Sequence, residues 1–393
     1  MQVGFVHFDR EDQKKYLAVL SKISEGGAID ELGVGRIRDY YSDLMFPGVS
    51  SLHQHAKYFA LMPLLFKEAV KRRYSRFEDV RPAIREMEIA LTKRLMKGSP
   101  NASGITGSDA VLNGTYVKYD PMYIYGMALR TWGIIKTDNI EGAIFYASKK
   151  YHERPVKLSA TDDEQGDSDD IESYLQFISP PVDIGYNWLE ECSLAMTHNE
   201  ASHVIHHILN ADEYRETLLH FILEEGLDLP HIEFVDFIDL YKNKLPQKLL
   251  AVAERARFFS DLVDGLFYRY NWLFSDHTDE GMRNKFDYWA SSVFQEEAHS
   301  MLDAISSIHI NDNGSIPFCQ NAISLISKQD WNALDLLIIK RERAIKQGGR
   351  HKIDNKANYQ YDPSNPIHNY KVEFRWSTVC TLVNELLGGL RNG

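Results

Sequence analysis

Apolar residues recur at helical spacing in many segments of the chain, and this pattern limits the fold more than any other feature. In the stretch GRIRDYYSDLM, for example, Ile37, Tyr41 and Leu44 fall on one face of a helix. The segment AERARFFSDLVDGLFYRYNWLF is more apolar still and predicts a buried helix. No period of 20–50 residues recurs, which argues against a repeat solenoid. We therefore expect a mainly α protein, a multi-helix body with a few short strands.

The periodicity and the turn residues also set approximate element boundaries. Two short strands are expected at 3–8 and 174–181, and a loop at 98–115 because small and polar residues dominate it. Ser50 or Ser51 is expected to cap the helix predicted at 52–73. The predicted helices cover 10–23, 36–45, 52–73, 80–97, 121–132, 254–273, 331–347 and 374–390.

The distribution of acidic residues suggests how the 393 residues are divided. Residues 159–173 hold seven acidic residues and no basic one, and they have almost no apolar side chains with which to form a core. We expect this stretch to be an acidic flexible linker. It separates an N-terminal helical region, residues 1–158, from a C-terminal helical region, residues 174–393.

Several classes of protein and site are disfavoured by simple absences from the sequence. No run approaches the roughly 20 apolar residues that cross a bilayer, so no membrane partner is expected. Cys192, Cys319 and Cys380 lie far apart without a C-x-x-C spacing, which argues against a disulfide framework or a thiolate metal site. No phosphate-binding glycine motif for a nucleotide is present. A cytoplasmic location is the expectation.

The net charge of −12 conceals two basic segments. Lys71–Lys97 contains nine Lys/Arg and four Asp/Glu, and Lys340–Lys356 contains seven and two, so each segment carries +5. Local patches of this kind bind phosphates on an acidic protein, because salt screens distant charges beyond roughly 10 Å. The alternative is that both segments are solvated helix faces. The residues predicted to contact DNA are Arg36, Arg38, Arg341, Arg343, Arg350 and Lys352.

The stretch from residue 35 to residue 55 combines carboxylates, arginines and histidines. Asp39 and Asp43 lie four residues apart, where like charges on a helix repel unless something holds them. A carboxylate beside arginines stays ionised and stabilises the oxocarbenium-like transition state of N-glycosidic bond cleavage. His53 or His55 would carry a proton. The alternative is structural, with Arg36–Asp39 and Arg38–Asp43 ion pairs that tie helices together.

Aromatic residues after the 98–115 loop suggest a platform for an extruded base. Tyr125 and Trp132 are the predicted stacking residues, and three further tyrosines share the segment: Tyr116, Tyr119 and Tyr123. Each of these side chains, taken alone, fits a place in the core better than a place in a platform.

Two other groups of polar residues favour structural roles. The histidines His198, His203, His206 and His207 lack an H-E-x-x-H spacing, so surface or capping roles are expected in place of a metal site. Asp261, Asp264 and Asn271 lie in an apolar helix, where Arg257 and Arg269 are near enough in sequence to pair the carboxylates.

Six strings of the sequence carry a resemblance to a known family. In order they are GFVHFDRED, DELGVGRIRDYYSDLMFPG, DPMYIYGMALRTWGI, ARFFSDLVDGLFYRYNWL, RERAIKQGGRHKI and FRWSTVCTLVNELLGGL. Together they span nearly the whole chain and resemble a family of bacterial proteins of unknown function that occurs in phage-defence neighbourhoods. The resemblance implies a DNA glycosylase that removes sugar-modified cytosines from phage DNA.

The resemblance can be carried over at individual positions. The residues that match are Arg36, Arg38, Asp39, Asp43, Phe46, Pro47, Gly48, Tyr125, Trp132, Asn271, Arg341 and Glu342. This chain departs from the family where relatives show a T-R-A-R-Y-like run and it reads HQHAKY. The departure puts in doubt a catalytic role for His53 or His55 as a family feature.

The leading hypothesis is an anti-phage DNA N-glycosylase. It would flip a bulky modified base, glucosylated hydroxymethylcytosine, out of double-stranded phage DNA and excise it, leaving an abasic site. The expected catalytic residues are Asp43, the favoured carboxylate, with Asp39 and His55; no metal and no organic cofactor is expected. Two alternatives stay open: a non-catalytic DNA-binding or adaptor subunit of a defence system, and a metal-dependent nuclease.

Overall fold

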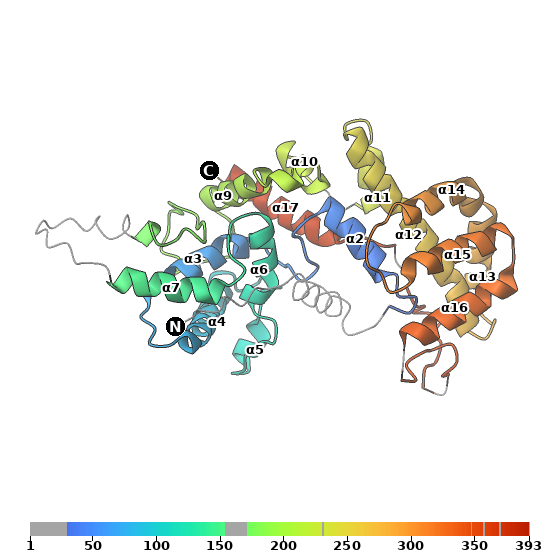
Figure 1. Cartoon of the computed structure of the whole chain (residues 1–393), viewed down its shortest axis with the longest axis horizontal. Coiled ribbons are helices and arrows are strands. Elements are labelled where there is room, and N and C mark those ends of the chain that lie inside the picture. The colour runs from blue at the N-terminus through green and yellow to red at the C-terminus, as the bar shows by residue number, and fades with distance from the viewer. Residues whose placement is uncertain are drawn as a thin grey trace, which may run out of the picture. The chain divides into compact units, whose positions relative to one another are not determined.

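The computed structural model describes residues 30–153, 171–229, 232–346, 348–356, 358–368 and 371–392 (Figure 1). These ranges contain fifteen α-helices and two 3-10 turns, which confirms the mainly α prediction. No strand forms in them. The segment 174–181, expected as a strand, makes a single bridge between Ile178 and Ile135.

Some predictions fall outside the described residues. They are the strand at 3–8, the helix at 10–23 and residues 159–170 of the acidic linker.

Contacts between backbone positions divide the described chain into two compact units. Unit 1 contains residues 46–229 and 377–392, and unit 2 contains residues 30–45 and 232–376, apart from the undescribed gaps. The division does not follow the linear order of the predicted domains, because the N-terminal helix α2 (Gly35–Met45) packs on helices α12 and α15 from the C-terminal half. The predicted boundaries at 158 and 174 stay a prediction.

Unit 1 is built around α3 (Lys57–Lys71). Its sequence, KYFALMPLLFKEAVK, is apolar on nearly every side, and twelve of its fifteen residues are buried. Four helices pack against it: α4 (Val80–Gly98), α6 (Pro121–Thr131), α7 (Ile140–Glu153) and α9 (His198–Leu209). The unit also contains α5 (Ser108–Leu112), α10 (Leu218–Glu224), the turns η1 (Phe77–Asp79) and η2 (Asp212–Tyr214), and α17 (Trp376–Arg391) from residue 377 onward.

The start of α3 differs from the prediction for a physical reason. The helix begins at Lys57, not near residue 52, and neither Ser50 nor Ser51 caps it. Instead Glu385, from α17, accepts the backbone N–H of Ala56 at 2.6 Å. A carboxylate at this helix start is favourable because it meets unpaired N–H groups and the positive end of the helix dipole.

Other boundaries in unit 1 agree closely with the sequence. The helix expected over 80–97 is α4, and the helix expected over 121–132 is α6. Asp120 caps α6 by accepting the N–H of Tyr123, with Pro121 in the first turn. The expected loop at 98–115 contains the short helix α5.

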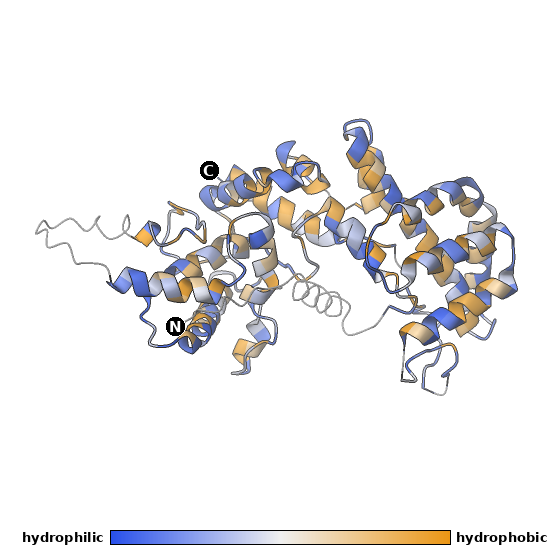
Figure 2. Ribbon diagram, viewed as in Figure 1, coloured by the Kyte–Doolittle hydropathy of each residue, from blue (hydrophilic) through white to orange (hydrophobic). Residues whose placement is uncertain are grey.

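Unit 2 is organised around the 28-residue helix α12 (Gln247–Phe274). It packs against α2, α11 (Phe234–Tyr241), α13 (Glu280–Ser291), α14 (Val293–Ser306) and α16 (Trp331–Ile345), while α15 (Ser315–Ser327) lies against α14, α16 and α2. Gly265 permits the close approach of α12 and α13, because a Cβ there would lie 2.4 Å from the Trp289 ring. Apolar residues gather on the helix sides that face one another inside each unit (Figure 2).

Among the described helices, none combines the length and apolar character that crossing a bilayer requires.

Candidate functional site

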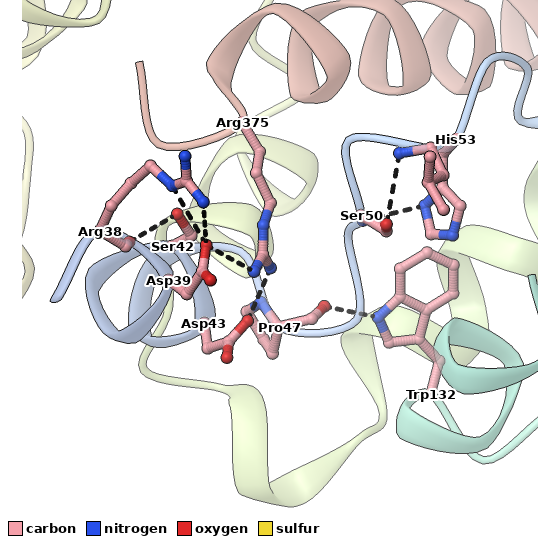
Figure 3. A network of polar contacts seen from close by, with 10 residues as sticks. Arg38, Asp39, Ser42, Asp43, Pro47, Ser50, His53, Trp132 and Arg375 are labelled. Carbon is pink, nitrogen blue, oxygen red and sulfur yellow. Dashed lines mark hydrogen bonds and ion pairs between the residues drawn. The ribbon is translucent and has the colours of Figure 1, made fainter. Parts of the chain in front are cut away.

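The two aspartates of α2 are held by arginines, one of which comes from the far end of the sequence (Figure 3). Asp39 accepts hydrogen bonds from Nε and Nη2 of Arg38 at 3.2 and 3.0 Å. Arg375 reaches both carboxylates, with Nη1 2.6 Å from Asp43 and Nη2 3.7 Å from Asp39. The shared guanidinium offsets the repulsion between carboxylates one helical turn apart.

The two ion pairs expected in the structural alternative, Arg36–Asp39 and Arg38–Asp43, are therefore wrong. Arg36 donates to the backbone oxygen of Asn311 at 3.0 Å, and Arg38 holds Asp39, not Asp43. Arg375, which is 332 residues from Asp43, has no signal in the sequence that identifies it as a partner. The string FRWSTV predicts only the start of the last helix.

Arg375 is aimed by an unusual backbone. Phe374 and Arg375 have φ values of 50° and 65°, a left-handed conformation that residues with side chains rarely adopt. Phe374 is buried against Tyr41 and Phe234, at ring-centroid distances of 6.2 and 5.5 Å. Aromatic packing thus holds a strained segment in place, and such strain concentrates at functional sites.

The two aspartates differ in accessibility. The Asp43 side chain is 51% exposed, compared with 24% for Asp39. Desolvation raises the pKa of the Asp43 carboxyl, and the charge of Arg375 opposes that rise. The exposed surface of the side chain and the 2.6 Å contact with Arg375 both favour the ionised form near neutral pH.

His53 and His55 are in different protonation states. His53 is buried, accepts the N–H of Ser50 at Nδ1 and lies 3.1 Å from the oxygen of Ile124 at Nε2, so it is a neutral ring. His55 faces Glu385 Oε1 at 2.7 Å and the oxygen of Ser103 at 2.8 Å. Both of these partners only accept hydrogen bonds, so His55 is the doubly protonated cation.

His55 therefore does not act as a free proton carrier in this structure. The hydrogen bond to Glu385 raises the pKa of His55, and the imidazolium joins the start of α3 to α17 within unit 1. Lys57, two residues further on, is also held by a carboxylate: its Nζ lies 2.6 Å from Oε2 of the buried Glu200. The HQHAKY run thus keeps a cation at the two positions where T-R-A-R-Y has arginines.

The predicted base-stacking residues lie in the core of unit 1, which corrects that prediction. Tyr125 is fully buried, with its ring between those of His53 and Tyr58, and its hydroxyl accepts the N–H of Gln54 at 3.1 Å. Trp132 is 2% exposed and donates its ring N–H to the oxygen of Pro47 at 3.0 Å (Figure 3). Neither ring has a face open to a base.

Much of the late basic segment also lies inside unit 2. Arg341 is buried and donates to the backbone oxygens of Leu32, Gly33 and Asn313 at 2.7, 3.1 and 3.0 Å. Its guanidinium is therefore a clamp on the segment before α2 and does not face DNA phosphates.

The other predicted phosphate ligands of this segment divide between internal and exposed positions. Lys352 pairs with Glu31 at 2.9 Å, and its backbone N–H donates to the fully buried Glu342 at 2.7 Å. Arg343 is 55% exposed but is held by two hydrogen bonds to Asp354. Arg350 is exposed. Several basic side chains of this segment are thus held by carboxylates of the fold, which a count of charges in the sequence does not reveal.

The carboxylates of α12 form the expected structural network. Asp261 lies 3.4 Å from Arg257 and 3.0 Å from Lys371, and burial raises the pKa of Asp264 to about 7. Arg269 pairs with Asp335 at 2.6 Å, a partner that the sequence did not indicate.

The histidines of α9 likewise have structural partners. His203 and His207 both approach Ser179, at 2.9 and 3.0 Å. Within the described part of the chain, no group of three or more His, Cys, Asp or Glu side chains is arranged to hold a metal ion.

A carboxylate pair in unit 1 was not anticipated from the sequence. Glu88, on α4, and Asp120, the cap of α6, are 1% and 2% exposed. Glu88 accepts the hydroxyl of Tyr116 at 2.5 Å and the N–H of Met122 at 2.8 Å, whereas Asp120 is paired with Arg81 at 2.5 Å. Burial and the neighbouring Asp120 charge raise the pKa of Glu88 to about 7. The Glu88 carboxyl is thus partly protonated near neutral pH.

A polar cleft of about 490 Å³ lies in unit 2 beside the end of α12. Two of its polar side chains already have partners, since Lys356 pairs with Asp276 and the hydroxyl of Tyr361 donates to Asp279 at 2.5 Å.

We predict that His55→Arg keeps the stability of the protein and that His55→Gln lowers it by about 1–3 kcal/mol, the usual worth of a hydrogen bond to a charged group. Denaturant unfolding at pH 6 measures the difference. The raised pKa of His55 means that its contribution is complete below pH 6.5 and is lost as pH rises through the folded value. Above pH 7 the stability of the wild type should therefore fall from that of His55→Arg toward that of His55→Gln, whereas the gap between the two variants stays constant. Equal stability of the two variants would contradict the cationic assignment.

The stability of the protein is also expected to depend on pH through Glu88, here because burial raises the pKa of the carboxyl. The pKa is about 7 in the folded protein and 4.5 ordinarily, so the folded state binds the proton more tightly than the unfolded state does. The free energy of unfolding should therefore fall by up to about 3 kcal/mol as pH rises from 4.5 to 7. Glu88→Gln mimics the protonated form and should flatten this loss in unfolding measurements at pH 5 and pH 8. The control is Glu86→Gln on the same helix, whose side chain is 72% exposed. If Glu88→Gln loses as much stability between pH 5 and pH 8 as the wild type does, the raised pKa is not that of Glu88.

Comparison with known proteins covers only the N-terminal part of the chain. No curated protein and no solved structure matches it at a significant level. The part that does match contains α2 to α7, with Asp39, Asp43 and the Glu88–Asp120 pair, but it does not contain Arg375 or the late basic segment. Residues 1–174 are similar to a family of unknown function, DUF6361.

Proposed function

We propose that the protein is a DNA N-glycosylase that excises a bulky modified base, glucosylated hydroxymethylcytosine, from double-stranded phage DNA. The observation that carries the proposal is the arrangement at α2, where an exposed carboxylate, Asp43, is fixed by an arginine on a strained backbone and backed by Asp39. The family resemblance of the sequence supplies the substrate class. A role in defence against phage follows from that substrate.

The chemistry of the reaction suits such a carboxylate. Hydrolysis breaks the bond between C1′ of the sugar and the base nitrogen, and a water oxygen then bonds to C1′. Positive charge develops on the sugar as the base leaves, so an ionised carboxylate stabilises the transition state and accepts the proton of the attacking water. The departing base takes up a proton from solvent or from an acid. The products are the free base and an abasic site.

Asp39 and Asp43 have different parts in this proposal. Asp39 is the less exposed and is bound by both Arg38 and Arg375, so it orients the pair. Among the described residues Asp43 has one ion-pair partner, Arg375, and its side chain is 51% exposed, so it is the proposed catalytic carboxylate. His55 is excluded from proton transfer in this proposal because both of its ring nitrogens are engaged.

The activity itself is tested with purified protein, EDTA and phage DNA that does or does not carry the modified base. Strand breaks that appear only after alkali, and only in modified DNA, are the expected result because alkali cleaves abasic sites. Direct breaks that EDTA abolishes would indicate a metal-dependent nuclease. Binding without any breaks would indicate a non-catalytic adaptor, and both outcomes contradict the proposal.

Substitution of the two aspartates by asparagine is predicted to separate the roles. Asp43→Asn should remain folded and lose about 100-fold or more in excision rate, while binding to modified DNA persists. Asp39→Asn should lower the free energy of unfolding by about 1–3 kcal/mol, because Arg38 and Arg375 lose a charged acceptor. The assay is single-turnover excision combined with thermal melting.

Asp303→Asn is the matched control for these variants. Asp303 is an aspartate of unit 2 with 52% exposure and an arginine partner, Arg255, at 2.8 Å. It should keep wild-type excision and nearly wild-type stability. If Asp43→Asn excises as fast as this control does, the α2 carboxylates are structural and the proposed assignment fails.

A further inference from the structure

Three partly exposed tyrosines gather where α6 begins in unit 1. Tyr119 and Tyr123 have ring centroids 5.0 Å apart and an interplanar angle of 37°. Tyr116 precedes them in the loop after α5. Tyr125, only two residues beyond Tyr123, points to the opposite side of the helix and is fully buried.

Two exposed cations lie on the faces of these rings. The guanidinium carbon of Arg85 is 4.5 Å from the ring centroid of Tyr116, and Nζ of Lys118 is 5.1 Å from that of Tyr119. Within the described ranges, neither cation forms an ion pair with a carboxylate. Cation–aromatic contacts at exposed sites are weak, so both cations can turn to another anion.

Two contacts anchor the segment that carries the rings. The carboxylate of Asp120 accepts the backbone N–H of Tyr123 at 2.9 Å and is itself held by Arg81. Glu88 accepts the hydroxyl of Tyr116 at 2.5 Å. Because these contacts are already formed, less backbone freedom at Tyr123 and less side-chain freedom at Tyr116 remain to be lost when a ligand binds.

We propose that these three tyrosines form a platform that binds unpaired nucleobases of DNA. Bases would stack on Tyr119 and Tyr123, while Arg85 and Lys118 move from the ring faces to the flanking phosphates. Every base has a π-face, so this recognition needs no particular sequence. The inference rests on the proposed function for its DNA partner, and it gives the stacking role to tyrosines other than the buried Tyr125.

The aromatic part is tested by Tyr119→Ala/Tyr123→Ala with unmodified oligonucleotides of one mixed sequence, used single-stranded and as the duplex. The Kd for the single strand should rise about 10-fold or more, and the Kd for the duplex less than about 2-fold. The Kd for a duplex with one unpaired base should rise as the Kd for the single strand does, which would extend the proposed stacking to an extruded base. An unchanged Kd for the single strand would overturn the proposal.

Matched variants separate stacking from unfolding. The control is Tyr146→Ala/Tyr288→Ala, which removes two tyrosines that are 61% and 71% exposed elsewhere, and it should change neither Kd. Tyr119→Phe/Tyr123→Phe keeps the rings and should bind as the wild type does. If the alanine variant melts early, Tyr119→Leu/Tyr123→Leu keeps the volume without a π-face and should still show the loss. Equal losses in the control would overturn the proposal.

The cationic part is tested by the dependence of affinity on salt. Arg85→Gln/Lys118→Gln should reduce the slope of log K against log salt for single-stranded DNA by about 1.4, which is roughly 0.7 for each phosphate that the variant no longer neutralises. Arg283→Gln/Lys285→Gln is the control, since it removes the same charge from α13 of unit 2. An unchanged slope in the first variant, or the same change in both, would overturn the proposal.

These measurements use unmodified DNA and do not depend on excision. If the wild type excises modified bases but the tyrosine variants bind and excise normally, the platform is wrong and the proposed function stands. If the tyrosine variants lose single-strand binding but the wild type excises nothing, the platform stands and the glycosylase proposal fails.

Discussion

The position of the α2 carboxylates depends on arginines from the last quarter of the chain. Arg341 binds three backbone oxygens, two of them directly before α2, and Arg375 binds both aspartates of the helix. A buried guanidinium is costly unless its donors are paired, so Arg341 specifies the path of residues 32 and 33 closely. Gly33 fits this clamp, since a Cβ there would lie 2.8 Å from the Arg341 side chain. The site therefore cannot form before the C-terminal part of unit 2 has folded.

The sequence predicted helices well because helix formation leaves a local pattern. The spacing of apolar residues placed α2, α4 and α6 within about two residues of their observed ends, and Asp120 and Pro121 marked the start of α6. Where an end is fixed by a distant group, the local signal misleads. The start of α3 depends on Glu385, more than 300 residues away, so the nearby serines gave the wrong boundary.

Charge in the sequence was a poorer guide than periodicity, for a related reason. A run of arginines and lysines has the same composition whether it faces water, DNA or carboxylates within the fold. In the late basic segment, Arg341, Lys346 and Lys352 all turn inward, and Glu31 pairs with both lysines. The partners come from the N-terminal part of the chain, and no local rule connects them. The same holds for the Glu88–Asp120 pair, whose members lie on different helices and have no local sequence signal that links them.

An overall charge of −12 is compatible with a DNA partner because buried carboxylates need not add to the field at the surface. Next to Tyr116 of the proposed platform, burial raises the pKa of Glu88 to about 7, so its carboxyl is partly protonated at neutral pH, and Arg81 pairs with Asp120. Arg85 and Lys118 are exposed at the ring faces of Tyr116 and Tyr119. Screening limits the reach of distant acidic residues to roughly 10 Å, so a phosphate bound beside these two cations would be affected mainly by the charges closest to it. Partial protonation of one buried glutamate thus makes the local potential that a nucleic acid would encounter less negative.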